Sequence, residues 1–238
     1  MARATVILKQ FLQSFAARCG YRIERDRRAQ HSLDVFDLAI RATQSTHGDE
    51  FFFVQIGAND GVSHDPIRQY IERFRWRGIL VEPQPNVFER LKRNYASQPQ
   101  LSFENAALAA HGESAILYSV VADDATTGMA SFDRSLLTKQ LPLGTKVLEL
   151  SVPTLTLDAL LRKHAVSSIH LLQIDAEGYD FEIIKMVDFS RVRPSVIHYE
   201  HRHLHESDRQ ACEELLAVNG YRVHLGHVDT TAVRTDGQ

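Results

Sequence analysis

Two short stretches, separated by about the length of one helix, limit what this chain can fold into. Residues 51–61 form an apolar run that ends in Gly-Ala-Asn-Asp-Gly, and residues 78–83 form an apolar run that ends in Glu-Pro. Each pattern is typical of a buried strand that leads into polar residues. Ligands of open parallel sheets bind beyond the carboxyl ends of the strands. The two stretches therefore predict an α/β domain with a ligand site at these strand ends.

The glycines and the acid in these stretches indicate the kind of ligand. Gly57 and Gly61 remove side chains where a ligand must approach the backbone. We expect the helix that follows to offer its free N–H groups to an anion. Glu82 comes 25 positions after Gly57, a spacing at which a carboxylate binds the two hydroxyls of a ribose. The combination predicts a cofactor that contains adenosine.

The residues between the two glycines bear on which cofactor this is. A nicotinamide site prefers Gly-x-Gly-x-x-Gly, because the pyrophosphate approaches closely at the middle glycine. Here Asn59 takes that position and Asp60 follows it. This acidic turn favours a cofactor without phosphates, such as S-adenosylmethionine, which carries a sulfonium, an ammonium and one carboxylate. An NAD(P)-dependent oxidoreductase explains Glu82 but not Asn59, and a turn that merely connects strand to helix is the simplest alternative.

Composition sets the broader limits. The chain has 238 residues, of which 44% are hydrophobic, enough for a sizeable core in one domain. The net charge of −3 gives no reason to expect a nucleic-acid partner. Cys19 and Cys212 match no metal or redox spacing. They suit a reducing compartment, so we expect a cytoplasmic protein.

The N-terminal segment, residues 1–50, is expected to be helical and to precede a cofactor-binding domain at 51–238. Residues 6–16 have apolar side chains at helical spacing, but polar residues such as Lys9 interrupt the run. It fits neither a signal peptide nor a membrane span. We expect an amphipathic helix on the domain or a partner, with a membrane-surface role as the alternative. The basic stretch at 22–28 is typical of a solvated face.

Strand and helix patterns alternate along most of the chain. This alternation predicts a doubly wound, mostly parallel sheet. A terminal hairpin across Gly226-His227 should add antiparallel strands at one edge. Pro153 should end a strand, and Thr156 should cap a helix. The expected strands are 51–56, 79–81, 101–108, 115–121, 147–152, 169–174 and 195–199, and the expected helices are 33–42, 66–71, 87–95, 156–161, 178–187 and 209–218.

The segment 123–144 lacks any clear periodicity. It is polar, contains glycine and is long for a connection inside a compact domain. Such loops are often functional lids. We expect this segment to be a mobile lid that carries the specificity for the acceptor.

Every predicted parallel strand ends in polar residues, and the later ends supply candidates for catalysis. Asp175 ends an apolar strand, where an unpaired carboxylate is costly; it could bind a cofactor ammonium, orient a hydroxyl or join a metal site. Glu177 stands before a helix, where the dipole stabilises negative charge. His201 is a candidate general base, since imidazole titrates near neutrality.

The run Glu-His-Arg-His-Leu-His at 200–205 raises the question of a metal. Its alternating histidines and its acid could hold a divalent ion. Such a loop is more often merely polar. We therefore expect a site without metal and keep a divalent ion as the alternative.

Several of these motifs resemble one family. Residues 54–61 and 79–83 resemble the first and second motifs of S-adenosylmethionine-dependent methyltransferases of the FkbM family, which have the Rossmann-like class I fold. Residues 105–108 resemble the third strand exit of the family, and residues 155–158 and 172–180 resemble its paired distinguishing blocks. The similarity covers roughly 51–233.

The resemblance implies an O-methyltransferase that acts on hydroxyls of sugars, glycans or natural products. The chain departs from the family pattern at Gln55, where many members have an acid, and at Gln173, where many have a lysine. A catalytically silent cofactor-binding module, with Gln55 as a mark of decay, is therefore a further alternative. The oligomeric state stays open. The residues expected to bind the cofactor are Gln55, Gly57, Ala58, Asn59, Gly61, Glu82, Pro83, Asn105 and Ala106.

Overall fold

The computed structural model describes residues 34–235 except 112, 123–124 and 141–144. The predicted amphipathic helix and basic stretch at the N-terminus, together with Cys19, lie outside these residues. In the part of the chain that is described, no helix combines the length and the apolar character needed to cross a membrane.

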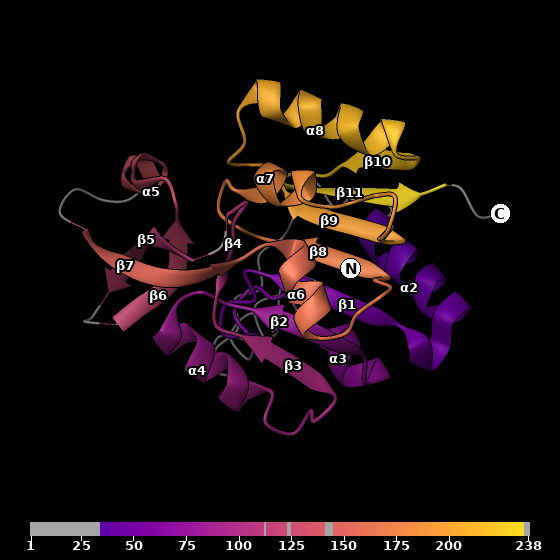
Figure 1. Ribbon diagram of the computed structural model, residues 1–238, viewed down its shortest axis with the longest axis horizontal. Helices are drawn as coiled ribbons and strands as arrows, with labels where there is room; N and C mark the ends of the chain where they lie inside the picture. Colours follow the sequence, from indigo (N-terminus) through magenta and orange to yellow (C-terminus); the bar gives the residue numbers. More distant parts are fainter. Residues whose placement is uncertain (1–33, 112, 123–124, 141–144, 236–238) are drawn as a thin grey trace, which may run out of the picture. The chain divides into compact units, whose positions relative to one another are not determined.

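A seven-stranded sheet forms the centre of the fold (Figure 1). Its order is β10-β11-β9-β8-β1-β2-β3, and all pairs among the five strands from β9 to β3 are parallel. The chain leaves β1 in one direction through β2 and β3, and later leaves β8 in the other direction. The neighbouring strands β1 and β8 therefore mark the topological switch point of the sheet. Ligands of such sheets bind beyond the carboxyl ends of the strands at this point. The parallel strands are β1 (Phe52–Ile56), β2 (Arg77–Val81), β3 (Leu101–Glu104), β8 (Leu171–Ile174) and β9 (Val196–Glu200).

The predicted C-terminal hairpin is confirmed. β10 (Tyr221–Leu225) and β11 (Asp229–Arg234) pair antiparallel, and β11 pairs antiparallel with β9. Gly220, with φ at 85°, ends the preceding helix in the left-handed conformation expected at such a position.

Helices cover both faces of this sheet, because its central strands are buried on both sides. In β1, Val54 joins the core cluster that holds residues of α6, α7 and α8, and Phe53 joins the cluster that holds residues of α2, α3 and α4. α2 and the short η1 (Gly48–Glu50) precede β1. The helices are α2 (Val35–His47), α3 (Arg68–Phe74), α4 (Pro85–Asn94), α6 (Leu157–Lys163), α7 (Asp180–Lys185) and α8 (Glu206–Val218).

A second, four-stranded sheet is inserted between β3 and β8. Its order is β4-β7-β5-β6, and the chain continues from β6 into a short helix, α5 (Arg134–Gln140) (Figure 1). The prediction that 123–144 is an irregular loop is therefore wrong, since these residues contain β6 and α5. The strands are β4 (Ala107–Leu108), β5 (Ser114–Ala122), β6 (Ala125–Ser131) and β7 (Lys146–Leu155).

Pro153 does not end its strand, as the sequence predicted. β7 continues to Leu155, because Pro153 lies opposite Ser114 of β5 and the next residues pair with β4. Thr156 does cap the following helix, as predicted, since its hydroxyl accepts a hydrogen bond from the Ala159 N–H at 3.1 Å.

The close approach of β1 and β8 depends on Gly57. This residue has φ at 75°, and a Cβ added to it would lie 1.8 Å from the carbonyl oxygen of Asp175. The absence of a side chain at Gly57 is therefore required by the backbone at the end of β8, whether or not a ligand binds here. Gly48 has φ at 52° but nothing within 4 Å of its position for a Cβ.

We predict that Gly57→Ala lowers the free energy of unfolding by about 4 kcal/mol or prevents folding, since backbone must move to admit the methyl group. Gly48→Ala is the matched control and should cost only the left-handed strain of about 1–2 kcal/mol. Urea denaturation of both variants measures the difference. Equal losses would contradict the assigned role of Gly57.

Candidate functional site

One cleft lies at the carboxyl ends of the parallel strands, at the switch point. Its empty space, counted together with the open solvent at its mouth, is about 640 Å³. Apolar residues such as Ile56 and Leu108 form part of its wall, and Gly128 and Ala130 of β6 contribute from the second sheet. The residues predicted from strand ends that line it are Gly57, Asn59, Glu82, Pro83, Ala106, Asp175 and Glu177.

Glu82 is the buried acid of this cleft, with 3% of its surface exposed. Its Oε2 accepts from the Asn59 N–H at 3.0 Å, and its Oε1 accepts from the Gln84 N–H at 2.9 Å. Burial raises the pKa of Glu82 to about 7, and the two N–H groups act in the opposite direction. Each carboxylate oxygen has a second lone pair, so the side chain can still accept hydrogen bonds from a ligand.

Three other predicted cofactor residues support the cleft from outside its lining. Ala58 is buried, and its N–H donates to the Val81 carbonyl oxygen. Asn105 donates its side-chain amide to the carbonyl oxygens of Glu82 and Pro83. A Cβ on Gly61 would lie 2.4 Å from the Tyr95 ring. Side-chain packing therefore explains Gly61, where the sequence argument had invoked a ligand.

The expectation of an anion site at a helix N-terminus after the glycine turn is wrong. α3 begins only at Arg68, and its first N–H groups already have a partner. Asp65 Oδ1 accepts from the N–H groups of Ile67 and Arg68. Asp60 similarly accepts from the backbone of Val62 and Ser63. Side-chain carboxylates thus occupy the positions that an anion would need.

Gln55, the remaining predicted cofactor residue, is buried away from the cleft lining beside Gln173. The two glutamines are register partners on β1 and β8, with 2% and 3% of their surface exposed. Gln55 Nε2 donates to Asp65 Oδ1 at 3.2 Å, whereas the amide oxygens of both glutamines have no hydrogen-bond partner among the described residues. The two positions at which the sequence departs from the expected family pattern are therefore direct neighbours, and both carry a neutral amide.

Asp175 and Glu177 line the same cleft as Glu82. Burial, reinforced by Asp229, raises the pKa of Asp175 to about 6. Burial and the charge of Asp175 raise the pKa of Glu177 to about 7. Both carboxyls can therefore gain or lose a proton near neutral pH, as groups in acid–base chemistry must.

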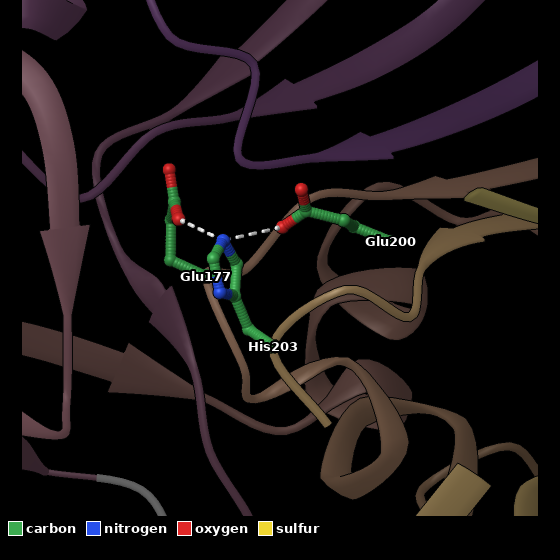
Figure 2. Close-up of side chains that lie close together, drawn as sticks. All are labelled: Glu177, Glu200 and His203. Carbon is green, nitrogen blue, oxygen red and sulfur yellow. Dashed lines mark ion pairs between the residues drawn. The ribbon is translucent and has the colours of Figure 1, made fainter. Parts of the chain in front are cut away.

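Glu177 also meets two residues from the end of β9. His203 Nε2 lies 3.4 Å from Glu177 Oε2 and 3.4 Å from Glu200 Oε2, and the three side chains converge on one point (Figure 2). Burial is the main cause that raises the pKa of Glu200 to about 8, and four carboxylates add to it: Asp175, Glu177, Asp180 and Asp229. The sequence analysis offered Glu200 and His203 as possible ligands of a divalent ion, in a loop that it expected to be merely polar.

His201, the predicted general base, lies outside the lining of this cleft. It is buried, and its Nδ1 is 2.8 Å from the Thr230 hydroxyl on β11. Burial, followed by the charge of Arg209, lowers its pKa. The next histidine in the chain, His203, is the one that faces Glu177.

A second cleft adjoins the first through Phe132, Glu177 and Tyr179, which line both. His203, His205, Asp133 and Asp208 line it as well. The two rings at the junction, Phe132 and Tyr179, meet edge to face with centroids 4.9 Å apart. Sequence reasoning missed these rings, because a pattern of isolated aromatics carries no signal of a site.

Two of the solved structures that match this chain are described as methyltransferases. The methyltransferase FkbM from Methylobacillus flagellatus KT matches 78% of this chain at 12% identity with a TM-score of 0.50, and the match covers 44% of that protein's own length. The precorrin-6y C5,15-methyltransferase from Geobacter metallireducens GS-15 matches 87% of this chain and 92% of its own, at 14% identity and a TM-score of 0.44. The fold is that of a class I methyltransferase, as the sequence predicted.

The sequence itself makes the relationship specific. The profile of the methyltransferase FkbM domain matches residues 55–223. This chain therefore belongs to the FkbM methyltransferase family. A search of the curated proteins gave no similar sequence. The family favours a methyltransferase over the alternative of an NAD(P)-dependent oxidoreductase.

The buried carboxyl of Glu82 predicts a pH dependence of stability. Its folded pKa lies above the unfolded value, so the folded state keeps a proton that the unfolded state has released. The stability contribution is therefore greatest below about pH 4.5 and falls by at most about 3 kcal/mol as the pH rises to about 7. Glu82→Gln should show a smaller loss of stability between about pH 5 and 7 in urea denaturation. Exposed Glu89→Gln, the control, should keep the full loss.

Because Gln55 and Gln173 are neighbours, we predict that substitutions at the two positions have strongly coupled effects on the free energy of unfolding. Gln55→Asp and Gln173→Lys each bury one unpaired charge, which costs about 3–5 kcal/mol of folding free energy. The double variant pairs the two charges and should recover about 1 kcal/mol or more relative to the sum of the single losses. Denaturation of the four proteins measures this coupling. Additive losses would show that the two side chains do not interact.

Proposed function

We propose that this protein is an S-adenosylmethionine-dependent O-methyltransferase that acts on a hydroxyl of a sugar, glycan or natural product. The observation that carries the proposal is the buried carboxylate of Glu82, at the end of β2 in a cleft that Gly57, Asp175 and Glu177 also line. One cleft thus offers an acceptor for ribose hydroxyls at one place and carboxylates at another.

The lining of the cleft fits this cofactor. Glu82 is held by two backbone N–H groups and keeps free lone pairs for the ribose. The apolar side chains around Ala106 and Leu108 supply a surface for a purine ring. Asp175 is placed to bind an ammonium. No cluster of basic side chains lines the described cleft, in agreement with a cofactor that has no phosphate.

Bound S-adenosylmethionine supplies a methyl group that its sulfonium already activates. The protein then has to hold the acceptor oxygen in line with that methyl group and to receive the hydroxyl proton. Asp175, with a pKa of about 6, is mostly ionised at neutral pH and suits the second task. Glu177 lines both clefts and suits the orientation of the acceptor hydroxyl.

The second cleft is the proposed site of the acceptor. It adjoins the proposed methyl end of the first cleft, and its charged side chains include three acids: Asp133, Glu177 and Asp208. Carboxylates repel a phosphorylated or acidic acceptor and accept hydrogen bonds from hydroxyls. This supports a neutral, hydroxyl-bearing acceptor.

Titration with S-adenosylhomocysteine, the product form of the cofactor, tests the cofactor site. We expect binding by calorimetry, and Glu82→Ala should weaken it by about tenfold to hundredfold, the effect of a lost charge-assisted bond. Glu89→Ala, an exposed acid on α4, should bind as the unchanged protein does. Unchanged affinity in Glu82→Ala would refute the proposed position of the ribose.

Transfer from labelled S-adenosylmethionine to neutral glycans and hydroxylated small molecules tests the reaction. Alkali-stable label in a product ether supports the proposal. Label that enters only amine or carbon acceptors would overturn the O-methyl assignment. Cofactor binding without transfer to any acceptor would favour the catalytically silent alternative.

A further inference from the structure

We propose that Glu177, Glu200 and His203 form a binding site for one divalent metal ion at the junction of the two clefts. The three residues come from two separate segments, the turn after β8 and the end of β9, and their side chains point to one place (Figure 2). The site goes beyond the proposed function and can be tested without any methyl transfer.

The distances suit a shared ion. One potential ligand atom from each residue lies within 4.8 Å of the others, and His203 Nε2 is 3.4 Å from a carboxylate oxygen of each glutamate. Neighbouring ligands of an octahedral ion at about 2.1 Å are separated by about 3 Å. Small side-chain rotations therefore bring all three atoms to bonding distance.

A protonated histidine between two acids is the plainest alternative, and the surroundings of His203 argue against it. Its side chain is only 9% exposed, so a charged ring here would lose most of its contact with water. A neutral imidazole carries at most one proton on Nε2 and serves one carboxylate with it. Glu200 Oε2 is buried and has no hydrogen-bond partner among the described residues. An ion bound by both carboxylates and by Nε2 satisfies this oxygen.

The charge around the three residues favours a cation. Asp229 is the register partner of Glu200, the Asp180 carboxylate accepts from the Glu200 N–H, and Asp175 precedes Glu177 by two residues. Two carboxylates and one imidazole suit a first-row divalent ion such as Mn²⁺. With three protein ligands, the remaining positions are left for water and a substrate oxygen.

The backbone holds the ligands in place before any ion binds. The Asp180 carboxylate accepts from the Glu200 N–H at 3.2 Å, and the Ser131 hydroxyl of β6 donates to the Glu177 carbonyl oxygen at 2.8 Å. Glu177 itself has φ at 47°, a left-handed conformation that is uncommon for this residue type. The second sheet therefore fixes the backbone of Glu177, and Asp180 fixes the backbone of Glu200.

An ion in this position would touch the second cleft, which Glu177 and His203 both line. If that cleft holds the acceptor, a metal-bound hydroxyl loses its proton more easily. Asp175 is not one of the three ligands and remains available to receive that proton.

Titration of the metal-free full-length protein with MnCl₂, followed by the electron paramagnetic resonance signal of free Mn²⁺, tests the site. We expect one Mn²⁺ per chain, and Glu200→Gln and His203→Gln should each weaken binding by at least about tenfold. Glu206→Gln is the control, because Glu206 lies on α8 nearby with its side chain 88% exposed. Circular dichroism and the melting temperature of each variant show whether it is folded.

Three results would overturn the site: no Mn²⁺ bound by the unchanged protein, equal binding by all variants, or the same loss in Glu206→Gln. If one of the two ligand variants fails to fold, the other decides. Cofactor titration of the same samples separates this proposal from the proposed function. Normal S-adenosylhomocysteine binding without Mn²⁺ binding would refute the metal site alone.

Discussion

The buried carboxylate of Glu82 connects the parts of the structure on which the site depends. Through two backbone N–H groups it joins the turn after β1 to the exit of β2. The next polar residue, Gln84, extends this connection to the second sheet, since its side chain donates to the Gly128 carbonyl oxygen and accepts from the Ser119 hydroxyl. A single acid therefore helps to hold the strand ends, the turn and the second sheet in one arrangement. If Glu82 also binds a ribose, the same side chain both stabilises this arrangement and contacts the ligand.

The sequence predicted the parallel strands well. A short, continuous apolar run such as Ile169 to Ile174 is typical of a strand in a sheet that is covered on both faces. The second sheet was missed in part for the opposite reason. The residues of β6, Ala125–Ser131, are mostly small and show no alternation. At Gly128 the small size has a local cause, because a Cβ there would lie 2.3 Å from Asn59 Oδ1. Glycine in a strand does indicate close backbone approach, but sequence does not say what approaches.

The candidate site likewise contains residues that the sequence predicted and residues that it did not. Glu82, Asp175 and Glu177 were predictable, because a polar residue directly after a buried strand must lie at the edge where ligands bind. The pairing of Glu177 with His203 was not, since it depends on how two loops fold over that edge. The choice between His201 and His203 depends on which way each ring points, and a run of alternating histidines leaves that open. The reason for Gly61, a nearby tyrosine ring, was equally hidden.

The Gln55–Gln173 pair has a consequence for the substitutions that this chain can accept. An acid and a lysine at these two positions would differ from the present pair by two substitutions on neighbouring strands. Either substitution alone would leave one unpaired charge in a dry interior and destabilise the fold. The two positions are therefore expected to accept a change of both side chains more readily than a change of one. This is epistasis that arises directly from the pairing of two strands.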